Sequence, residues 1–257
     1  ENITHFCGAP IILQMIINEL KNIKIKNKVK VMTAASPPPP NMLEKIEKKG
    51  FEITHVYGLT ESYGPAVVCE WKTGWDGIKS AKKRAILKAR QGVKYPSLEF
   101  LDVKEPETMT SVSRNGKSLG EVMFKGNIVM KGYLRDKNAN NVAFKDSWFH
   151  TGDLAVMHRD GYIELKDRSK DIIISGGENI SSIEIEKIIL QHEQVNDCAV
   201  IGINDIKWGE VPCAFVEIKE KQISEKNIID YCKKYLAGYK LPKKIIFMPL
   251  PRTSTGK

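Results

Sequence analysis

The first part of the chain alternates between helical and extended hydrophobic patterns. Apolar residues over 11–20 predict a helix, and the apolar positions within 41–49 predict a second one. The β-branched runs 29–32 and 51–56 predict strands on either side of that second helix. A strand, a helix and a strand in succession form a βαβ unit, in which the strands are parallel and the loops after them meet at one edge of the sheet. Sheets of this kind bind their ligands at that edge.

From residue 93 to residue 165 the pattern changes to short apolar alternations separated by Gly, Asn and Asp. The segments 98–103, 121–124 and 162–165 have this character, which is typical of antiparallel strands joined by turns. We therefore expect a small antiparallel β-subdomain after the βαβ unit.

The last third of the chain mixes strand and helix patterns and predicts a compact α+β domain. Residues 181–184 (Ser-Ser-Ile-Glu) form a capping box, which opens a helix. A second helix is expected to begin near Ser224. The spacing of an amphipathic helix would place Ile228, Cys232 and Tyr235 on one face. The strands expected here are 170–175, 197–201, 213–218 and 243–247.

The composition of the 257 residues, with 42% hydrophobic and 28% charged side chains, is that of an ordinary globular protein and excludes fibrous classes. The sequence has no apolar run near the roughly 18 residues that span a bilayer. The net charge of +9 favours anionic partners such as nucleic acid, an acidic membrane or phosphate-bearing small molecules. The basic runs 21–30 and 79–94 lack the interleaved aromatic residues of nucleic-acid binders. We interpret them as solvated lysine-rich surfaces and expect no nucleic-acid partner.

The five cysteines are scattered along the sequence and form no CxxC pair, which favours a reducing compartment over a disulfide framework. The sequence shows no basic segment followed by an apolar one of the kind found in secretory signals. We therefore expect a reducing location such as the cytoplasm.

Two short segments carry groups suited to a nucleotide. Residues 57–61 (Tyr-Gly-Leu-Thr-Glu) form a loop after a predicted strand and offer a ring for a base, a hydroxyl for a phosphate and a carboxylate for Mg²⁺, which prefers oxygen ligands. Residues 148–153 (Trp-Phe-His-Thr-Gly-Asp) offer a carboxylate that can accept hydrogen bonds from two ribose hydroxyls. His150 lies in the second segment, but nothing nearby pairs with it, and we give it no catalytic role.

Two further segments have plainer interpretations when each is taken alone. Residues 167–171 (Asp-Arg-Ser-Lys-Asp) are typical of a salt-bridge cluster on the surface. Residues 253–257 (Thr-Ser-Thr-Gly-Lys) are typical of a flexible tail.

Taken together, the order and content of these segments resemble the adenylate-forming superfamily, which includes acyl-CoA synthetases, firefly luciferase and the adenylation domains of peptide synthetases. Residues 131–133 (Lys-Gly-Tyr), 148–153 and 167–179 look most like the plant acyl-activating enzymes and the medium-chain acyl-CoA ligases. The resemblance covers essentially the whole chain, with residues 71–90 as an insertion specific to the family.

The resemblance implies an α/β fold with two domains. Residues 1–169 would form the C-terminal part of a large AMP-binding N-terminal domain, comprising the βαβ sheet and the antiparallel β-subdomain. Residues 170–257 would form a slightly truncated, small α+β C-terminal domain. The family's Ser/Thr/Gly-rich phosphate loop and its His-containing motif near the acyl pocket would both precede Glu1. The chain therefore looks like a fragment, and we expect no adenylation from it alone, because ATP would lack a phosphate cradle.

The resemblance also implies roles for single residues that match family motifs. The implied nucleotide-binding residues are Ala35 and Ser36 against the adenine, Tyr57 stacked on it beside Gly58, Asp153 on the ribose, and Arg168. The implied catalytic residues are Thr60 on the phosphates, Glu61 as the Mg²⁺ ligand, and Lys257, which assists adenylate formation. The implied elements of the second step are Lys170 as the hinge of the C-terminal domain, with Gly176 and Gly177 lining the CoA channel. Residues 33–36 (Thr-Ala-Ala-Ser) stand where relatives usually have glycines before the prolines.

The activity implied is that of an acid–thiol ligase. A fatty or aromatic carboxylic acid attacks the α-phosphate of ATP, pyrophosphate leaves, and the CoA thiol then takes the acyl group from the acyl adenylate. ATP or AMP, Mg²⁺ and CoA are the implied ligands, and the carboxylic acid and CoA are the implied small-molecule partners. A peroxisomal location, as an alternative to the cytoplasm, is implied only by this resemblance. Two alternatives stay open: an adenylation domain that acylates a carrier protein, and a non-catalytic remnant that binds AMP or CoA.

Overall fold

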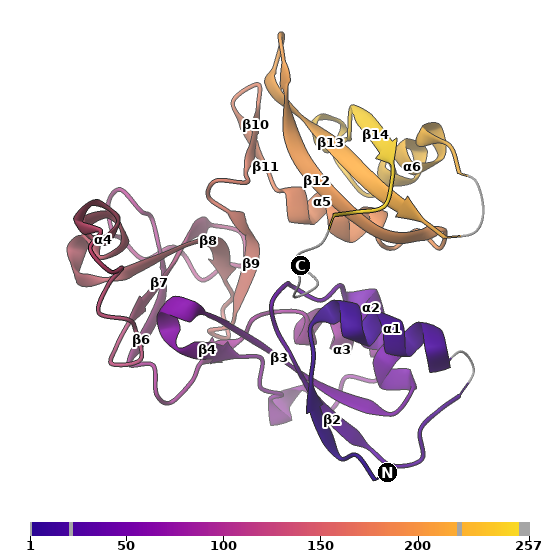
Figure 1. The fold of residues 1–257 in the computed structure, drawn as a ribbon, viewed down its shortest axis with the longest axis horizontal. Coiled ribbons are helices and arrows are strands. Elements are labelled where there is room, and N and C mark those ends of the chain that lie inside the picture. The colour runs from indigo at the N-terminus through magenta and orange to yellow at the C-terminus, as the bar shows by residue number, and fades with distance from the viewer. Residues whose placement is uncertain (1, 21–22, 220–222, 252–257) are drawn as a thin grey trace. The chain divides into compact units, whose positions relative to one another are not determined.

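A computed structural model describes residues 2–20, 23–219 and 223–251. This part of the chain divides into two units, one that ends at Leu165 and one that begins at Lys166 (Figure 1). We refer to them as unit 1 and unit 2. Among the described residues, buried apolar side chains form two clusters in unit 1 and one cluster in unit 2.

Unit 1 opens with a five-stranded sheet in the order β1-β2-β3-β4-β5. Its strands are β1 (His5–Cys7), β2 (Val29–Thr33), β3 (Phe51–Leu59), β4 (Gly64–Val68) and β5 (Val93–Lys94). The helices of this part are α1 (Pro10–Leu20), α2 (Pro40–Lys48) and α3 (Ala81–Lys88), with the 3₁₀ turns η1 (Thr60–Ser62) and η2 (Thr73–Trp75). Strands β1 to β3 are parallel, and β4 and β5 are antiparallel to their neighbours. Because β2 and β3 are parallel with α2 between them in the chain, the predicted βαβ unit is confirmed.

The sequence of α2 explains why this segment forms a helix with one buried face. Pro40 occupies its first turn, where the missing N–H has no helical partner to lose and the fixed φ suits the helix. Leu43 and Ile46 are fully buried one turn apart, so one stripe of the helix faces the core. Lys45 and Lys48 lie in the last turn, where cations interact favourably with the helix dipole.

Strand β3 is longer than the sequence predicts. It continues through Leu59, because the antiparallel β4 pairs with the segment from Val56 to Leu59 and extends the ladder. Tyr57 and Gly58 therefore lie in the strand and not in a loop after it, which corrects the prediction. Gly58 permits this close pairing, since a Cβ there would lie 2.0 Å from the carbonyl oxygen of Gly64.

A four-stranded sheet in the order β6-β7-β8-β9 completes unit 1 and confirms the predicted β-subdomain; its β6–β7 and β7–β8 pairs are antiparallel. Its elements are β6 (Phe100–Lys104), β7 (Leu119–Lys125), β8 (Phe149–Met157) and β9 (Ile163–Arg168), with α4 (Lys137–Ala143) and the turn η3 (Lys145–Ser147). The nine-residue β8 has no counterpart among the predicted strands. Polar residues at 150–153 interrupt its apolar alternation, which hides the strand from pattern analysis.

Unit 2 is an α+β unit with a sheet in the order β11-β10-β13-β12 and β14 beside β13. Its elements are β10 (Ile173–Ser175), β11 (Glu178–Ile180), β12 (Val195–Asp205), β13 (Gly209–Ile218), β14 (Lys244–Phe247), α5 (Ser182–Ile189), α6 (Glu225–Cys232) and the turn η4 (Gly238–Lys240). Ile228 and Cys232 are fully buried, as predicted, but Tyr235 is 57% exposed. The prediction for Tyr235 is wrong because α6 ends at Cys232 and the chain leaves the helical path.

Two further corrections concern the start of unit 2. The strand predicted over 170–175 begins only at Ile173. Asp167 is buried, and its carboxylate accepts the backbone N–H of Ser182 at 2.6 Å. This N–H lies in the first turn of α5, where donors have no helical partner and a carboxylate is favourable. Asp167 is therefore a helix-capping residue, and the surface salt-bridge interpretation of residues 167–171 is wrong for it.

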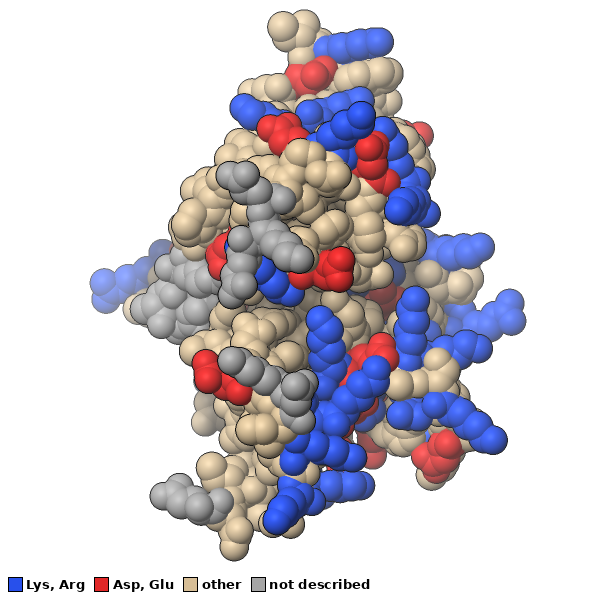
Figure 2. Space-filling model, turned by 90° about the vertical axis from the view of Figure 1, so that its right-hand side faces the viewer, with Lys and Arg blue, Asp and Glu red and all other residues tan. Residues whose placement is uncertain are grey.

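The charge surplus lies on exposed lysines. Figure 2 shows one face of the molecule on which lysine and arginine side chains outnumber acidic ones. The exposed lysines include Lys24, Lys26, Lys28, Lys45 and Lys82, in agreement with solvated lysine-rich surfaces. Within the described ranges, no helix combines the length and the apolarity that crossing a membrane requires.

Glu186 is a half-buried acid on α5 in unit 2. Its carboxylate on α5 accepts the backbone N–H of Val200 at 2.8 Å. Burial raises the pKa of Glu186 from its ordinary value of 4.5 to about 7, with smaller contributions from Asp167, Asp197 and Asp171, while the Val200 N–H opposes the shift. The folded state therefore binds this proton more tightly than the unfolded state does.

We expect unit 2 to lose stability as the pH rises through about 7. The contribution of the protonated carboxyl is fully present below its unfolded pKa, near 4.5, and is lost as the group ionises. Glu186→Gln stays neutral and keeps an oxygen for Val200, so its free energy of unfolding should vary less between roughly pH 5 and 8. Urea unfolding of both proteins across this range measures the difference.

The matched control is Glu184→Gln, which changes a partly exposed carboxylate on the same helix that forms an ion pair with Lys240. This control should retain the wild-type dependence of stability on pH. Parallel curves for wild type and Glu186→Gln would contradict the assignment.

Candidate functional site

The two sheets of unit 1 meet at a hydrogen bond between residues from the two predicted nucleotide segments. The phenol hydroxyl of Tyr57, on β3, donates to Oδ2 of Asp153, on β8, at 2.6 Å. Tyr57 is 8% exposed and Asp153 is 6% exposed. The ring of Tyr57 packs at a tilt against Phe124, with 5.9 Å between the ring centroids. Two of the residues proposed to contact one nucleotide are therefore direct neighbours.

Glu61 and Thr60 follow directly in η1, at the carboxyl end of β3. Thr60 is exposed and Glu61 is half-buried. The turn is fixed by Ser62, whose buried hydroxyl accepts the N–H of Leu59 at 2.9 Å and contacts the carbonyl oxygen of Gly64 at 2.8 Å. The backbone carbonyl of Glu61 accepts the N–H of Met130 at 2.7 Å. These contacts hold the carboxylate at the edge of the sheet where the βαβ unit predicts a ligand.

Tyr133 is a contact of the site that sequence reasoning missed. Its hydroxyl donates to Oε1 of Glu61 at 3.0 Å, and burial, followed by this hydrogen bond, raises the pKa of Tyr133. Asn140 fixes the backbone of Tyr133 from both sides, accepting its N–H at 2.6 Å and donating to its carbonyl oxygen at 2.9 Å. Residues 131–133 are among the segments that carry the family resemblance, but a sequence gives no sign of a contact between residues 72 positions apart.

The protein groups near Glu61 fit a Mg²⁺ ion that takes most of its ligands from a bound substrate and water. Glu61 offers one carboxylate, and among the described residues no group of three or more His, Cys, Asp or Glu side chains is arranged to hold a metal. Mg²⁺ usually takes one or two protein carboxylates and completes its octahedron with phosphates and water. The single carboxylate of Glu61, next to the exposed hydroxyl of Thr60, is consistent with this mode of Mg²⁺ binding.

Ala35 adopts an unusual backbone conformation after β2. Its φ is +85°, in the left-handed region that glycine favours, and both Ala35 and Ser36 are exposed. The family resemblance implies glycines in the segment 33–36, and a glycine would suit the observed φ of Ala35. Ala35 therefore adopts a backbone conformation that glycine favours, and its Cβ makes this conformation strained.

His150 does have a partner, contrary to the sequence-based statement. Its Nδ1 lies 3.0 Å from Oε2 of Glu121, a buried residue on the neighbouring strand β7. The two residues are 29 positions apart, and the antiparallel pairing of β7 and β8 brings them together.

Four of the other proposed site residues lie in unit 2. Arg168 is exposed at the end of β9, and Lys170 is exposed in the turn before β10. Gly176 and Gly177 form the turn between β10 and β11, with φ of +60° and +86°, as a two-residue hairpin turn with positive φ requires. Lys257 lies outside the described residues.

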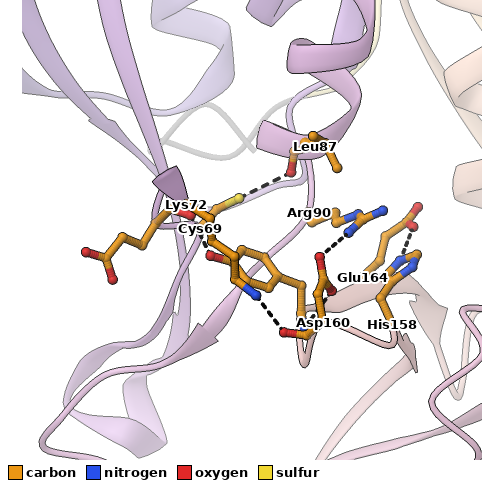
Figure 3. A network of polar contacts seen from close by, with 9 residues as sticks. Cys69, Lys72, Leu87, Arg90, His158, Asp160 and Glu164 are labelled. Carbon is orange, nitrogen blue, oxygen red and sulfur yellow. Dashed lines mark hydrogen bonds and ion pairs between the residues drawn. The ribbon is translucent and has the colours of Figure 1, made fainter. Parts of the chain in front are cut away.

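The segment 71–90 is part of unit 1, and Figure 3 shows its residues Lys72 and Arg90 beside Asp160. Trp71, Trp75 and Tyr162 form a chain of aromatic contacts, with centroids 5.2 Å and 4.9 Å apart, beside a cavity of about 560 Å³. Lys72 Nζ donates to the carbonyl oxygen of Asp160 at 2.7 Å, and Arg90 forms an ion pair with the carboxylate of Asp160 at 3.3 Å. Lys72 and Arg90 thus tie the two ends of this segment to the turn that carries Asp160.

Fold and site together define an α/β domain with Thr60 and Glu61 at the carboxyl edge of a parallel strand, the edge at which such sheets bind ligands. Residues 1–134 match the family profile "AMP-binding enzyme", and residues 184–257 match the profile "AMP-binding enzyme C-terminal domain". The chain belongs to the AMP-binding enzyme family. The predicted resemblance to adenylate-forming enzymes is thereby confirmed.

The chain is similar to plant acyl-CoA ligases. It is 49% identical over 264 residues to acetate–CoA ligase CCL3 of Humulus lupulus, covering 99% of this chain and 46% of the relative. It is 48% identical over 261 residues to the peroxisomal trans-cinnamate:CoA ligase of Petunia hybrida, covering 100% of this chain and 46% of the relative. The chain thus spans about half the length of the curated relatives it matches.

The fold is that of solved adenylating enzymes. The o-succinylbenzoate CoA synthetase of Bacillus subtilis, in complex with an acyl-adenylate intermediate, superimposes with a TM-score of 0.82 at 31% identity. This comparison covers 99% of this chain and 49% of that one. The α/β fold class predicted from the sequence is confirmed by this likeness.

Ala35→Gly is expected to stabilise unit 1. A non-glycine residue in the left-handed region lowers the free energy of unfolding by roughly 1–2 kcal/mol. The greater conformational freedom of glycine in the unfolded chain offsets roughly 0.4–1 kcal/mol of the gain from removing this strain. The net gain should be about 1 kcal/mol in the free energy of unfolding. Urea unfolding monitored by tryptophan fluorescence measures it; Trp71, Trp75 and Trp148 report on unit 1, and Trp208 reports on unit 2.

Ala34→Gly is the matched control, because Ala34 is not among the residues with positive φ. It should lower the stability by roughly 0.4–1 kcal/mol. A loss of stability in both variants would show that Ala35 is not strained.

Proposed function

We propose that this chain carries the adenylate-binding site of an acid–thiol ligase. The parent enzyme would join a fatty or aromatic carboxylic acid to CoA, through an acyl adenylate and with release of pyrophosphate. The observation that carries the proposal is the convergence of Tyr57 and Asp153 at 2.6 Å, with Glu61 in the turn that continues the same strand. The names of the relatives, which include acetate–CoA and trans-cinnamate:CoA ligases, support the reaction class.

The proposed nucleotide contacts follow from the chemistry of these side chains. The Asp153 carboxylate can accept hydrogen bonds from two ribose hydroxyls, and the Tyr57 hydroxyl already orients it. The Tyr57 ring would stack on the adenine beside Gly58, and the loop at Ala35 and Ser36 would pack against the same base.

The phosphates would lie by the exposed hydroxyl of Thr60 and the carboxylate of Glu61. Mg²⁺, when bound by Glu61, would supply positive charge where negative charge develops on the phosphoryl oxygens. The hydroxyl of Tyr133 donates to Glu61 and so orients its carboxylate. We assign Lys257, outside the described residues, to the same task of charge neutralisation.

The second step is assigned to the C-terminal domain, which we propose to span residues 170–257 after an AMP-binding domain of residues 1–169. A rotation at Lys170 would bring Gly176 and Gly177 to the CoA channel, and Arg168 would contact the nucleotide. A domain motion that completes a second active-site surface is a common way to separate two steps. Lys170 lies in a turn between strands, where such a rotation is accommodated without breaking a ladder.

We propose a peroxisomal or cytoplasmic location. Relatives such as the trans-cinnamate:CoA ligase of Petunia hybrida and the acetate/butyrate–CoA ligase AAE7 of Arabidopsis thaliana are named peroxisomal. The proposed partners are a small carboxylic acid and CoA, whose anionic groups suit the basic surface of the chain.

AMP binding by the isolated chain tests the site. We expect the wild type to bind AMP and Asp153→Asn to bind it about 10- to 100-fold more weakly, because hydrogen bonds to a carboxylate are lost. The amide introduced by this substitution would still offer an oxygen to Tyr57, so the local fold should persist. Isothermal titration calorimetry measures both affinities.

Asp160→Asn is the matched control, since Asp160 also lies in unit 1 but belongs to the structural network of residues 71–90. It should bind AMP as the wild type does. Equal affinities for the wild type and Asp153→Asn would contradict the proposed site.

A further inference from the structure

A buried carboxylate of unit 1 has so far no part in the proposed function. Glu121 on β7 is 7% exposed, and its two oxygens have different partners. Oε1 accepts the backbone N–H of Gly152 at 2.7 Å, and Oε2 lies 3.0 Å from Nδ1 of His150. Both partners lie in the segment that leads directly into Asp153.

That segment is an irregularity of the β7–β8 ladder. Glu121 pairs with Leu154 and Met123 pairs with His150, so one residue of β7 faces three residues of β8. These three residues of β8 are Thr151, Gly152 and Asp153. A bulge of this kind redirects a side chain but leaves backbone N–H groups without their ladder partners.

Side chains replace the missing ladder bonds. The Gly152 N–H donates a hydrogen bond to the Glu121 carboxylate, and the Asp153 N–H donates one to the hydroxyl of Thr151 at 3.1 Å. That hydroxyl in turn donates to the carbonyl oxygen of Val122 at 2.8 Å. Gly152 has a φ of +73°, which only a glycine adopts without strain. The bulge thus depends on Glu121 for the hydrogen bond of the Gly152 N–H.

We propose that Glu121 is a positioning residue for the ribose site: it holds the β8 bulge in the geometry that directs Asp153 toward Tyr57 and the nucleotide. The assignment rests on the proposed function for the identity of the ligand, and on the contacts of β7 and β8 for the positioning itself. His150 serves as the second contact of the carboxylate and fixes its rotamer.

The first test compares AMP with 2′,3′-dideoxy-AMP, which lacks the ribose hydroxyls. Glu121→Leu keeps the bulk of the side chain but offers no acceptor to Gly152. It should weaken AMP binding about tenfold, the effect of losing one buried acceptor, and leave 2′,3′-dideoxy-AMP binding unchanged. A general loss of structure would weaken both ligands equally. Glu121→Gln keeps an oxygen for Gly152 and should restore the preference for AMP.

The second measurement needs no ligand and separates this proposal from the proposed function. Hydrogen exchange of the Gly152 and Asp153 amides should become faster in Glu121→Leu and remain slow in Glu121→Gln. Glu164→Leu is the matched control: it breaks a second carboxylate–histidine contact, with His158 at 3.0 Å, on β9 of the same sheet. It should change neither the exchange of these amides nor the preference for AMP.

The outcomes are distinct. If the wild type binds AMP with a ribose preference that Glu121→Leu retains, the positioning role is wrong while the proposed function stands. If the wild type binds no AMP, the proposed function fails, and unchanged amide exchange in Glu121→Leu would overturn the positioning role as well. Glu121→Ala is measured beside Glu121→Leu, so that the result does not depend on the folding of one variant.

Discussion

The hydrogen bond between Tyr57 and Asp153 is the contact on which the proposed site depends. It joins β3 of the first sheet to β8 of the second across 96 positions of the sequence. Both side chains are nearly buried, and a hydrogen bond to a carboxylate in such a place contributes roughly 1.5–3 kcal/mol. The same bond sets the relative positions of the Tyr57 ring and the Asp153 carboxylate, which we propose contact one nucleotide. One hydrogen bond therefore both stabilises the fold and sets the geometry of the proposed binding site.

The groups around this bond are placed by local departures from regular structure. Ser62 stabilises the turn that carries Thr60 and Glu61. A bulge in β8 directs Asp153, and a positive φ shapes the loop at Ala35. Side chains supply hydrogen bonds at the first two of these features, and Ala35 bears backbone strain; such features are typical of functional sites. The regular strands between them supply a rigid frame.

The sequence predicts the regular parts of this molecule well and the irregular parts poorly. Hydrophobic period and capping residues predict the βαβ unit and the helix at Ser224, because local physics decides them. Strand β8 is missed, since the polar residues that build its bulge break the alternation. The sequence does not reveal that Glu121 contacts His150, because 29 positions separate them. It does not reveal that Tyr133 contacts Glu61 either, because 72 positions separate those two residues. Motif resemblance supplies the candidate residues, and only the fold shows which of them touch.

The central claim is that Tyr57 forms one wall of an adenylate site. Its most direct test is a titration with AMP of the chain carrying ring-labelled tyrosine, followed by NMR. We expect the ring signals of Tyr57 to shift and saturate, while those of Tyr162, whose hydroxyl donates to the carbonyl oxygen of Glu70 at 2.6 Å beside the segment 71–90, stay in place. Signals of Tyr57 that do not move while AMP binds, or an equal shift of both tyrosines, would contradict the account.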